Sequence, residues 1–197
     1  LVARGLAESR SAAQRLVLEG KVRVQDVPSP KPGNAYSEDI GIEILAPERF
    51  VSRGGEKLEG AFAAFGLNVE GLSCLDVGAS TGGFTDCLLQ HGAARVIALD
   101  VGHDQFHPRL RADSRVTVIE KFNARNMTPA DLPYVPEFAV CDVSFISLRL
   151  ILPPMAAVVA PGSGLVTLIK PQFEAGREKV GRGGVVRDEA TRLEVVE

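Results

Sequence analysis

Residues 72–89, LSCLDVGASTGGFTDCLL, join a strand-like apolar run to a helix-like one through a turn rich in glycine. Glycine adopts positive φ angles and lets the backbone approach a ligand closely, so such a turn can wrap a small molecule. The spacing of Gly78, Gly82 and Gly83 differs from the GxGxxG pattern that presents a helix N-terminus to a pyrophosphate. Asp76, just before the turn, would repel phosphate but could accept hydrogen bonds from a ligand's ammonium group. The turn therefore predicts a ligand with an ammonium group and no phosphate.

A second carboxylate, Asp100, ends the next strand-like run, twenty-two residues after Gly78. An acid in this position can accept hydrogen bonds from both hydroxyls of an adenosine ribose. S-adenosylmethionine carries an ammonium group, a ribose and a positive sulfonium but no phosphate, so the two acids favour this cofactor over NAD. Asn123, after the third strand, could reach the adenine edge, although an ordinary surface loop explains it equally well. The predicted cofactor-binding residues are Asp76, Gly78, Ala79, Ser80, Thr81, Gly82, Gly83, Phe84, Asp100, Val101, Asn123, Ala124 and Asp142.

Three further polar residues stand where the carboxyl ends of parallel strands would gather them. Asp142 ends the run FAVCD, Lys170 ends GLVTLIK, and Lys57 lies on the helix-like segment before the first strand. A lysine at the apolar end of a strand is partly removed from water, whereas a nearby aspartate favours its charged form. Such a set can hold and activate a weakly acidic hydroxyl beside a cationic methyl donor. The alternative is a plain structural ion pair, which is common in proteins.

The cysteines and histidines predict no metal site. Cys74, Cys87 and Cys141 lie in apolar runs without CxxC spacing, so we expect buried reduced thiols, as in a reducing cytosol. His103 and His107 are four residues apart, but apart from the neighbouring aspartate no third ligand is evident, which favours surface or cleft roles. These features predict a cytoplasmic protein.

The elements that must position these residues alternate between strand-like and helix-like runs from residue 52 onward. Alternating β and α units predict an open parallel sheet with helices on both faces, whose strand carboxyl ends all meet at one edge. Residues 1–46 are instead typical of a small α/β module, and residues 47–51 of a linker. We therefore predict an α/β chain, with a small N-terminal domain followed by a Rossmann-like domain for S-adenosylmethionine over residues 52–197.

The chain of 197 residues has a net charge of −3, but its first 31 residues hold six basic groups against three acidic ones. A basic end on a mildly acidic protein indicates contact with nucleic acid. The most apolar stretch, LRLILPPMAAVVAPG, is too short for a bilayer and contains prolines, so we expect no membrane span. The predicted RNA-binding residues are Arg4, Arg10, Ser11, Arg15, Lys21, Arg23, Lys31 and Arg53.

Several stretches resemble a known family. RGLAESRSAAQRLVLEGKVRV is similar to the small RNA-binding module named after ribosomal protein S-four. VSRGGEKL, CLDVGASTGGFTDCLL, CDVSFISL and LIKPQFEAGREKVGRGGVVRD resemble successive landmarks of the TlyA family, known both as haemolysins and as 2′-O-ribose methyltransferases of ribosomal RNA. The similarity extends over nearly the whole chain.

The resemblance implies an FtsJ-like methyltransferase domain that acts on ribosomal RNA or ribosomal subunits. It also implies a Lys-Asp-Lys-Glu tetrad, with Lys57, Asp142 and Lys170 as its first three members and the glutamate beyond residue 197. Both ends of the chain lie inside helical patterns, so we expect it to be part of a longer protein. In the implied reaction a ribose 2′-hydroxyl attacks the sulfonium methyl group, Lys170 takes or screens its proton, Asp142 orients Lys170, and Lys57 steadies the ribose or phosphate. A membrane-active haemolysin and an RNA-binding protein with a vestigial site stay open as alternatives.

Overall fold

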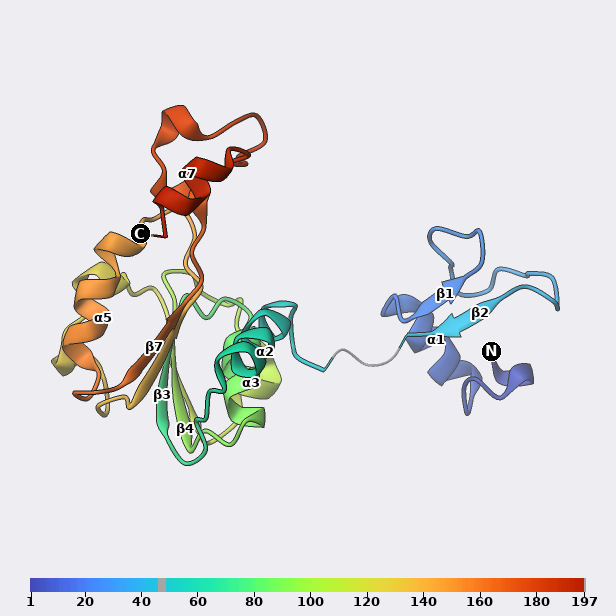
Figure 1. The fold of residues 1–197 in the computed structure, drawn as a ribbon. Coiled ribbons are helices and arrows are strands. Elements are labelled where there is room, and N and C mark those ends of the chain that lie inside the picture. Colours follow the sequence, from blue (N-terminus) through green and yellow to red (C-terminus); the bar gives the residue numbers. More distant parts are fainter. Residues whose placement is uncertain (46–48, 197) are drawn as a thin grey trace. The chain divides into compact units, whose positions relative to one another are not determined.

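The computed structural model describes residues 1–45 and 49–196, and the chain divides into two units, Leu1–Arg49 and Phe50–Glu197 (Figure 1). Residue 46, the end of the predicted N-terminal module, and residues 47 and 48 of the predicted linker lie outside the described residues. Phe50, from the same predicted linker, is 2 % exposed and packs in the core of the second unit. Its ring lies against Gly55, where an added Cβ would stand 2.2 Å from the ring.

The first unit contains a short 3-10 helix, one α-helix and two strands. These are η1 (Val2–Arg4), α1 (Arg10–Leu18), β1 (Val22–Val24) and β2 (Ile42–Ile44). Helix α1 begins at Arg10 because the Ser9 side chain accepts a hydrogen bond from the Ala12 amide, one of the free N–H groups of the first turn. The strands pair antiparallel, and the alternation VRV buries Val22 and Val24 while Arg23 stays in solvent.

The second unit is built on a parallel sheet of five strands in the order β5-β4-β3-β6-β7. The strands are β3 (Ser73–Val77), β4 (Arg95–Leu99), β5 (Val116–Ile119), β6 (Phe138–Cys141) and β7 (Gly164–Thr167). The central strands are buried along their whole length, which explains their nearly continuous apolar sequences. This arrangement confirms the predicted α/β fold with an open parallel sheet.

Helices cover both faces of this sheet, with α2 and α3 on one face and α5 on the other (Figure 1). The α-helices are α2 (Gly54–Phe65), α3 (Gly83–Gln90), α4 (Pro108–Arg111), α5 (Leu152–Val158), α6 (Pro171–Glu174) and α7 (Glu189–Glu194). Short 3-10 helices are η2 (Ala124–Asn126), η3 (Pro129–Asp131), η4 (Leu148–Leu150) and η5 (Arg177–Lys179). Two separate apolar clusters lie on opposite faces, one around Phe62 and Leu88 and the other around Ile97 and Met155.

The strand order reverses next to β3. The chain moves outward from β3 through β4 to β5 and then returns to place β6 on the other side of β3. At such a reversal the crossovers leave the sheet in opposite directions, which opens a crevice at the carboxyl ends of the two central strands. The glycine turn follows β3 and Asp142 follows β6, so the fold brings both to this crevice. No helix within the described parts of the chain has the length and apolar character needed to cross a membrane.

Candidate active site

The three residues predicted to carry the reaction meet at the carboxyl edge of the sheet. Lys57 Nζ, on α2, lies 3.0 Å from Asp142 Oδ2, and Lys170 Nζ, between β7 and α6, lies 2.5 Å from Asp142 Oδ1. The side chains of Asp142 and Lys170 are 16 % and 18 % exposed, whereas Lys57 is 47 % exposed. One carboxylate thus holds two lysines from elements that are 113 residues apart in the chain (170 − 57).

The charge of Asp142 is set by two opposing effects. Partial burial raises the pKa of its carboxyl group, but hydrogen bonds from Lys170 and Lys57 lower it more, and the net pKa lies below the ordinary value. The carboxylate is therefore ionised around neutral pH and presents a fixed negative charge to both lysine side chains. A fixed charge of this kind orients the amines before any substrate binds.

Ser144 is a site residue that sequence reasoning missed. Its Oγ accepts a hydrogen bond of 2.8 Å from Lys170 Nζ, so the lysine is held by a carboxylate and a hydroxyl together. The signal in the sequence was the short polar residue two places after Asp142, in the motif CDVSFIS. Glu174, the only glutamate in the motif KPQFE, has a structural role instead: it accepts hydrogen bonds from the Ser147 hydroxyl and the Leu148 amide.

The glycine turn between β3 and α3 forms the other wall of the site. Gly78 has φ +83°, and a Cβ added there would lie 2.9 Å from the carbonyl oxygen of Asp142. Gly83, the first residue of α3, lies so close to the start of α2 that a Cβ would stand 2.9 Å from the Gly55 amide nitrogen. Only glycine fits at either position, which brings the turn against both Asp142 and the helix that carries Lys57.

A hollow of about 690 Å³ opens between these parts. Its lining includes the predicted glycine-turn residues 78–81, Gly83 and Phe84, together with the two lysines and Asp142. Arg53, predicted to contact RNA, also lines it. The sequence analysis had not selected the remaining lining residues, Ser52, Gly54 and Ser144.

Asp76, predicted to bind the cofactor, lies on the strand before the turn and is not among the residues that line the hollow. Its side chain is fully buried, its Oδ2 accepts a 2.7 Å hydrogen bond from the Thr85 hydroxyl, and its Oδ1 has no partner among the described groups. Burial raises the pKa of this carboxyl group to about 7, since an ionised carboxylate is poorly solvated there. The physical reason is the position of Asp76 on the central strand β3, whose two faces are covered by helices.

Asp100 closes the glycine turn from the neighbouring strand. Its Oδ2 accepts a 2.7 Å hydrogen bond from the Ser80 amide, and its Oδ1 accepts one of 2.7 Å from the Gly102 amide. The first bond holds Ser80 in a left-handed conformation, with φ +49°. Each carboxylate oxygen has a second lone pair, so Asp100 can shape the turn and still accept hydrogen bonds from a ribose.

Other predicted cofactor residues lie away from the hollow. The Asn123 side chain accepts a hydrogen bond from the Arg125 amide and so caps η2, which agrees with the alternative of an ordinary loop. Ala124 is buried, and Val101 is 71 % exposed. Among the residues that the structure describes, the lining of the hollow includes none of these, nor Asp100 or Gly82.

Three of the basic residues predicted to bind RNA have partners within the first unit. The Arg4 guanidinium donates a 2.6 Å hydrogen bond to the carbonyl group of Ile40. Lys21 lies 2.9 Å from Glu19, and Arg23 lies 3.4 Å from a glutamate of β2. These side chains are all at the surface, so the contacts are weak and do not prevent binding to phosphate.

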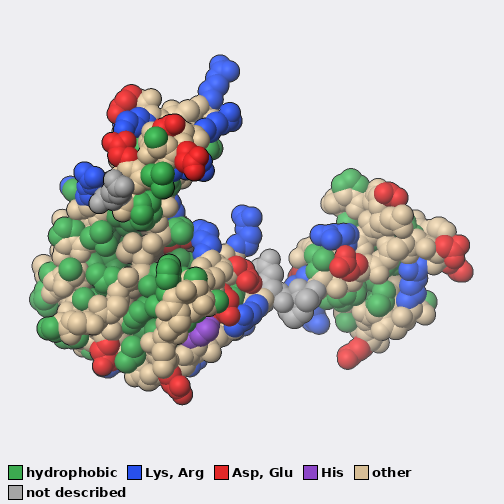
Figure 2. All heavy atoms as spheres, in the orientation of Figure 1, with side chains coloured by type: hydrophobic (Ala, Val, Ile, Leu, Met, Phe, Trp, Pro, Cys, Tyr) green, Lys and Arg blue, Asp and Glu red, His purple; other side chains and the backbone are tan. Residues whose placement is uncertain are grey.

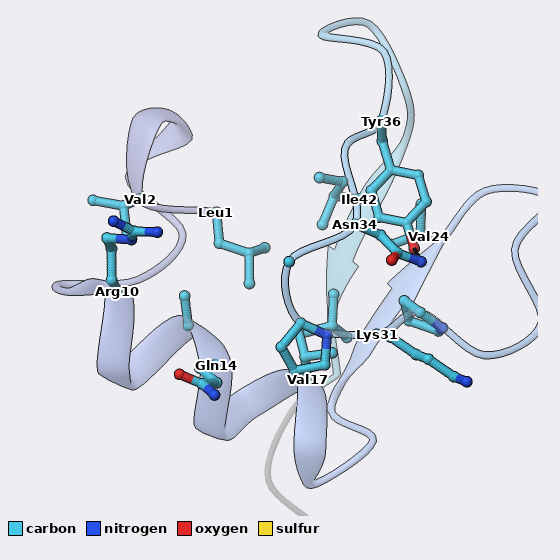
Figure 3. Close-up of a pocket in the computed structure, with 15 residues that line it drawn as sticks. Leu1, Val2, Arg10, Gln14, Val17, Val24, Lys31, Asn34, Tyr36 and Ile42 are labelled. Carbon is cyan, nitrogen blue, oxygen red and sulfur yellow. Dashed lines mark hydrogen bonds between the residues drawn. The ribbon is translucent and has the colours of Figure 1, made fainter.

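The remaining predicted RNA-binding residues of this unit, Arg10, Ser11, Arg15 and Lys31, are exposed. Arg10 and Lys31 line a pocket of about 520 Å³, together with Asn34 and Tyr36 (Figure 3). In Figure 3 the pocket lies between α1 and the two strands, with an apolar floor that includes Val17 and Val24.

The cysteines and His107 of the second unit have structural surroundings. All three cysteines are buried free thiols, and the predicted burial is confirmed. The His107 ring accepts a hydrogen bond from the Arg109 amide at the start of α4.

Two features of the structure show that the site fits S-adenosylmethionine. The first is the glycine turn, of which Gly78, Ala79, Ser80 and Thr81 line the hollow, so a ligand in the hollow would lie against the turn. The second is Asp76 Oδ1, a buried acceptor two residues before Gly78 that has no partner in the described parts of the chain. The chain would hold the cofactor with the turn residues and Asp100, next to the amines of Lys57 and Lys170.

Comparisons with known proteins agree with this geometry. Residues 50–197 match the family model of the FtsJ-like methyltransferases. The chain is 49 % identical over its full length to "Putative rRNA methyltransferase YqxC" of Bacillus subtilis and covers 70 % of it. It is 46 % identical over its full length to the 16S/23S rRNA (cytidine-2′-O)-methyltransferase TlyA of Mycobacterium tuberculosis, of which it covers 74 %.

A solved structure also matches almost the whole chain. The "Putative hemolysin from Streptococcus thermophilus" superposes with a TM-score of 0.76 at 45 % sequence identity. The match covers 97 % of this chain and 70 % of the haemolysin chain. The names haemolysin and rRNA methyltransferase thus both occur among its relatives, as the resemblance implied. The site geometry, the family model and these relatives together place the chain in the family of FtsJ-like methyltransferases, whose methyl donor is S-adenosylmethionine.

Proposed function

We propose that this protein methylates ribose 2′-hydroxyl groups of ribosomal RNA. The observation that carries the proposal is the group of Lys57, Asp142 and Lys170 on the wall of the hollow, in which each lysine amine lies within 3.0 Å of an Asp142 carboxylate oxygen. Relatives at 46 % and 49 % identity are named as rRNA methyltransferases, one of them for the 2′-oxygen of cytidine. Ribosomal RNA as substrate also implies that the protein acts in the cytoplasm.

S-adenosylmethionine supplies a methyl group on a positively charged sulfonium, which is already a good leaving group. The residues of the chain therefore have mainly to position the acceptor hydroxyl and to manage its proton. Lys170 is the residue proposed to take or screen that proton, since Asp142 and Ser144 fix its amine from two sides. Lys57 is more exposed, and within the part of the chain that the structure describes its amine pairs with Asp142 alone, which suits contact with the ribose or its phosphate.

Exposed aromatic and basic side chains near the site support an RNA substrate. Phe145, next to Ser144, is 91 % exposed in a left-handed conformation with φ +63°, and its ring centroid lies 5.2 Å from that of Phe173. Unstacked RNA bases bind to exposed rings of this kind. Arg53, exposed on the wall of the hollow, adds a positive charge at the site. The C-terminal segment carries basic and acidic side chains side by side, as Figure 2 shows around α7.

The test is methyl transfer to ribosomal RNA or ribosomal subunits by the wild-type protein and by Lys170→Ala. We expect the variant to bind S-adenosylmethionine with unchanged affinity and to lose about 10²–10⁴-fold in methyl transfer, the usual contribution of proton-transfer groups. Arg115→Ala is the control, because Arg115 pairs with Asp113 just before β5, away from the carboxyl edge. Equal rates for wild type and Lys170→Ala would refute the assignment.

The two alternative functions predict different results for the wild-type protein. A protein with a vestigial site would bind the cofactor and RNA without methyl transfer by the wild type. A membrane-active haemolysin would release dye from liposomes. The described part of the chain contains no helix that is long and apolar enough to cross a membrane. The proposed function predicts methyl transfer and intact liposomes.

A further inference from the structure

A cluster of three side chains with metal-binding chemistry lies between α2 and α3, separate from the lining of the hollow. Glu59 comes from α2, and Cys87 and His91 come from α3 and its C-cap. Glu59 Oε2 lies 2.7 Å from His91 Nε2 and 3.8 Å from Cys87 Sγ. One ligand atom from each residue lies within 4.8 Å of the other two.

The helices hold this cluster in place. Cys87 and His91 are four residues apart, so one turn of α3 presents both on the same face. The His91 ring stacks on Phe62 of α2, with centroids 3.9 Å apart and planes at 11°, which fixes the ring with Nε2 toward Glu59. Cys87 is fully buried, whereas the side chains of Glu59 and His91 are each 29 % exposed. The cluster therefore has a rigid apolar base and a side open to solvent.

The donor set has a definite preference among metals. Thiolate sulfur, imidazole nitrogen and carboxylate oxygen together suit zinc, whereas magnesium and calcium take oxygen ligands. With zinc–ligand bonds of about 2.0–2.3 Å, neighbouring donors in a tetrahedral site lie roughly 3.3–3.7 Å apart. The observed distance of 3.8 Å is close to this range, and that of 2.7 Å is shorter. Because the His91 ring is held by Phe62, an ion is admitted by rotation of the partly exposed Glu59 side chain away from His91.

We propose that Glu59, Cys87 and His91 bind one divalent zinc-class ion, with a water molecule from the open side as the fourth ligand. Binding deprotonates the Cys87 thiol and releases its proton to solvent, so affinity rises with pH. The ion joins α2, which carries Lys57, to α3, which begins at the glycine turn. Its effect is to stabilise this helix pair, and it takes no part in the proposed methyl transfer.

The experiment is titration of zinc into the chelator-treated protein in competition with a chromophoric chelator. We expect one equivalent bound and a rise in melting temperature. Cobalt in place of zinc should give a thiolate-to-cobalt charge-transfer band, because one ligand is sulfur. Cys87→Ala should abolish this band. Glu59→Gln should weaken metal binding at least about tenfold, because removal of a ligand costs at least as much affinity as removal of a group that only hydrogen-bonds to a ligand.

Cys74→Ala and Cys141→Ala are matched controls, since both remove a buried thiol from elsewhere in the same unit. Melting curves of every variant in the presence of chelator test whether each variant still folds. If Cys87→Ala does not fold, the nearly isosteric Glu59→Gln still tests the metal site. Failure of the wild type to compete with the chelator would overturn the proposal. Unchanged binding in both Cys87→Ala and Glu59→Gln would overturn it as well, because the metal would then be held elsewhere.

Discussion

Two buried aspartates at the carboxyl edge of the sheet illustrate how partners decide the charge of a side chain. Asp142 is partly buried beside two lysines, which lower its pKa in spite of this burial. Asp76 is fully buried, and the hydrogen bonds that it accepts from Thr85 do not offset burial, which raises its pKa to about 7. Asp142 therefore contributes to stability above its unfolded pKa, and this contribution is lost as the pH falls through its folded pKa. Asp76 has the opposite linkage.

Asp76→Asn should change the pH dependence of stability. The folded wild type keeps a proton on Asp76 up to about pH 7, while the unfolded chain releases it at an ordinary value, so stability is lost as the pH rises between these two pKa values. The loss relative to the variant is at most about 1.4 kcal/mol per pH unit. Urea unfolding of both proteins at about pH 4 and about pH 8 measures it. The exposed Asp104→Asn is the control for removal of a carboxylate, and parallel pH curves for wild type and Asp76→Asn would contradict the burial of a proton.

Helix α2 connects several features at the scale of secondary structure. Its first turn packs against Gly83 at the start of α3, its next residues present Lys57 to Asp142, and Phe62 anchors it in the core. A change in the packing of α2 on α3 must therefore move the lysine relative to the glycine turn. The close approach of the two helix starts depends on the absence of side chains there.

Gly83→Ala tests this packing. The new Cβ would lie 2.3 Å from Ser52 Oγ and 2.9 Å from the Gly55 amide nitrogen, and the backbone group cannot rotate away. We expect a loss of about 1–3 kcal/mol in the free energy of unfolding, as for other overpacked sites, and weaker cofactor binding. Gly60→Ala, on the exposed side of the partner helix α2, has no atom within 4 Å of its Cβ outside its own helix and should gain about 0.5–1 kcal/mol. Thermal unfolding and calorimetric titration measure both effects, and equal stability of the two variants would disprove the packing argument.

At the scale of the whole molecule, charge is distributed unevenly over a chain with a net charge of −3. An acidic protein binds a polyanion only through local basic surfaces, and exposed Arg10 and Arg15 on α1 belong to such a surface in the first unit. The second unit contributes Arg53 and the two lysines at the hollow. We therefore expect RNA affinity to depend on both units.

Replacing Arg10 and Arg15 together by Gln should weaken RNA binding without changing cofactor affinity. Each lost phosphate contact should reduce the slope of log affinity against log salt by about 0.7–0.9, because fewer counterions are released. Binding measured at several salt concentrations gives this slope. Arg115→Gln, which removes one cation paired with Asp113, is the control. An unchanged slope in the double variant would show that α1 does not contact RNA phosphates.

The sequence by itself determined the α/β alternation and the glycine turn, and it predicted that Asp142 and Lys170 meet at one edge of the sheet, while Lys57, which stands at no strand end, was assigned to the tetrad through the family resemblance. These features follow from local patterns: buried parallel strands are continuously apolar, and the carboxyl ends of such strands must meet at one edge. Residues that stand at strand ends could thus be assigned to one site without coordinates. The similarity to FtsJ-like methyltransferases agrees with this assignment.

Only the tertiary structure decided which way each side chain points and what it meets. The covered central strand buries Asp76, the hydrogen bonds of Asp100 close the turn, Asn123 caps a 3-10 helix, and Ser144 reaches Lys170. The cluster between α2 and α3 also depends on tertiary packing, because Glu59 and His91 are 32 residues apart and belong to different elements. Such contacts arise from the docking of helices on the sheet, which no local periodicity encodes.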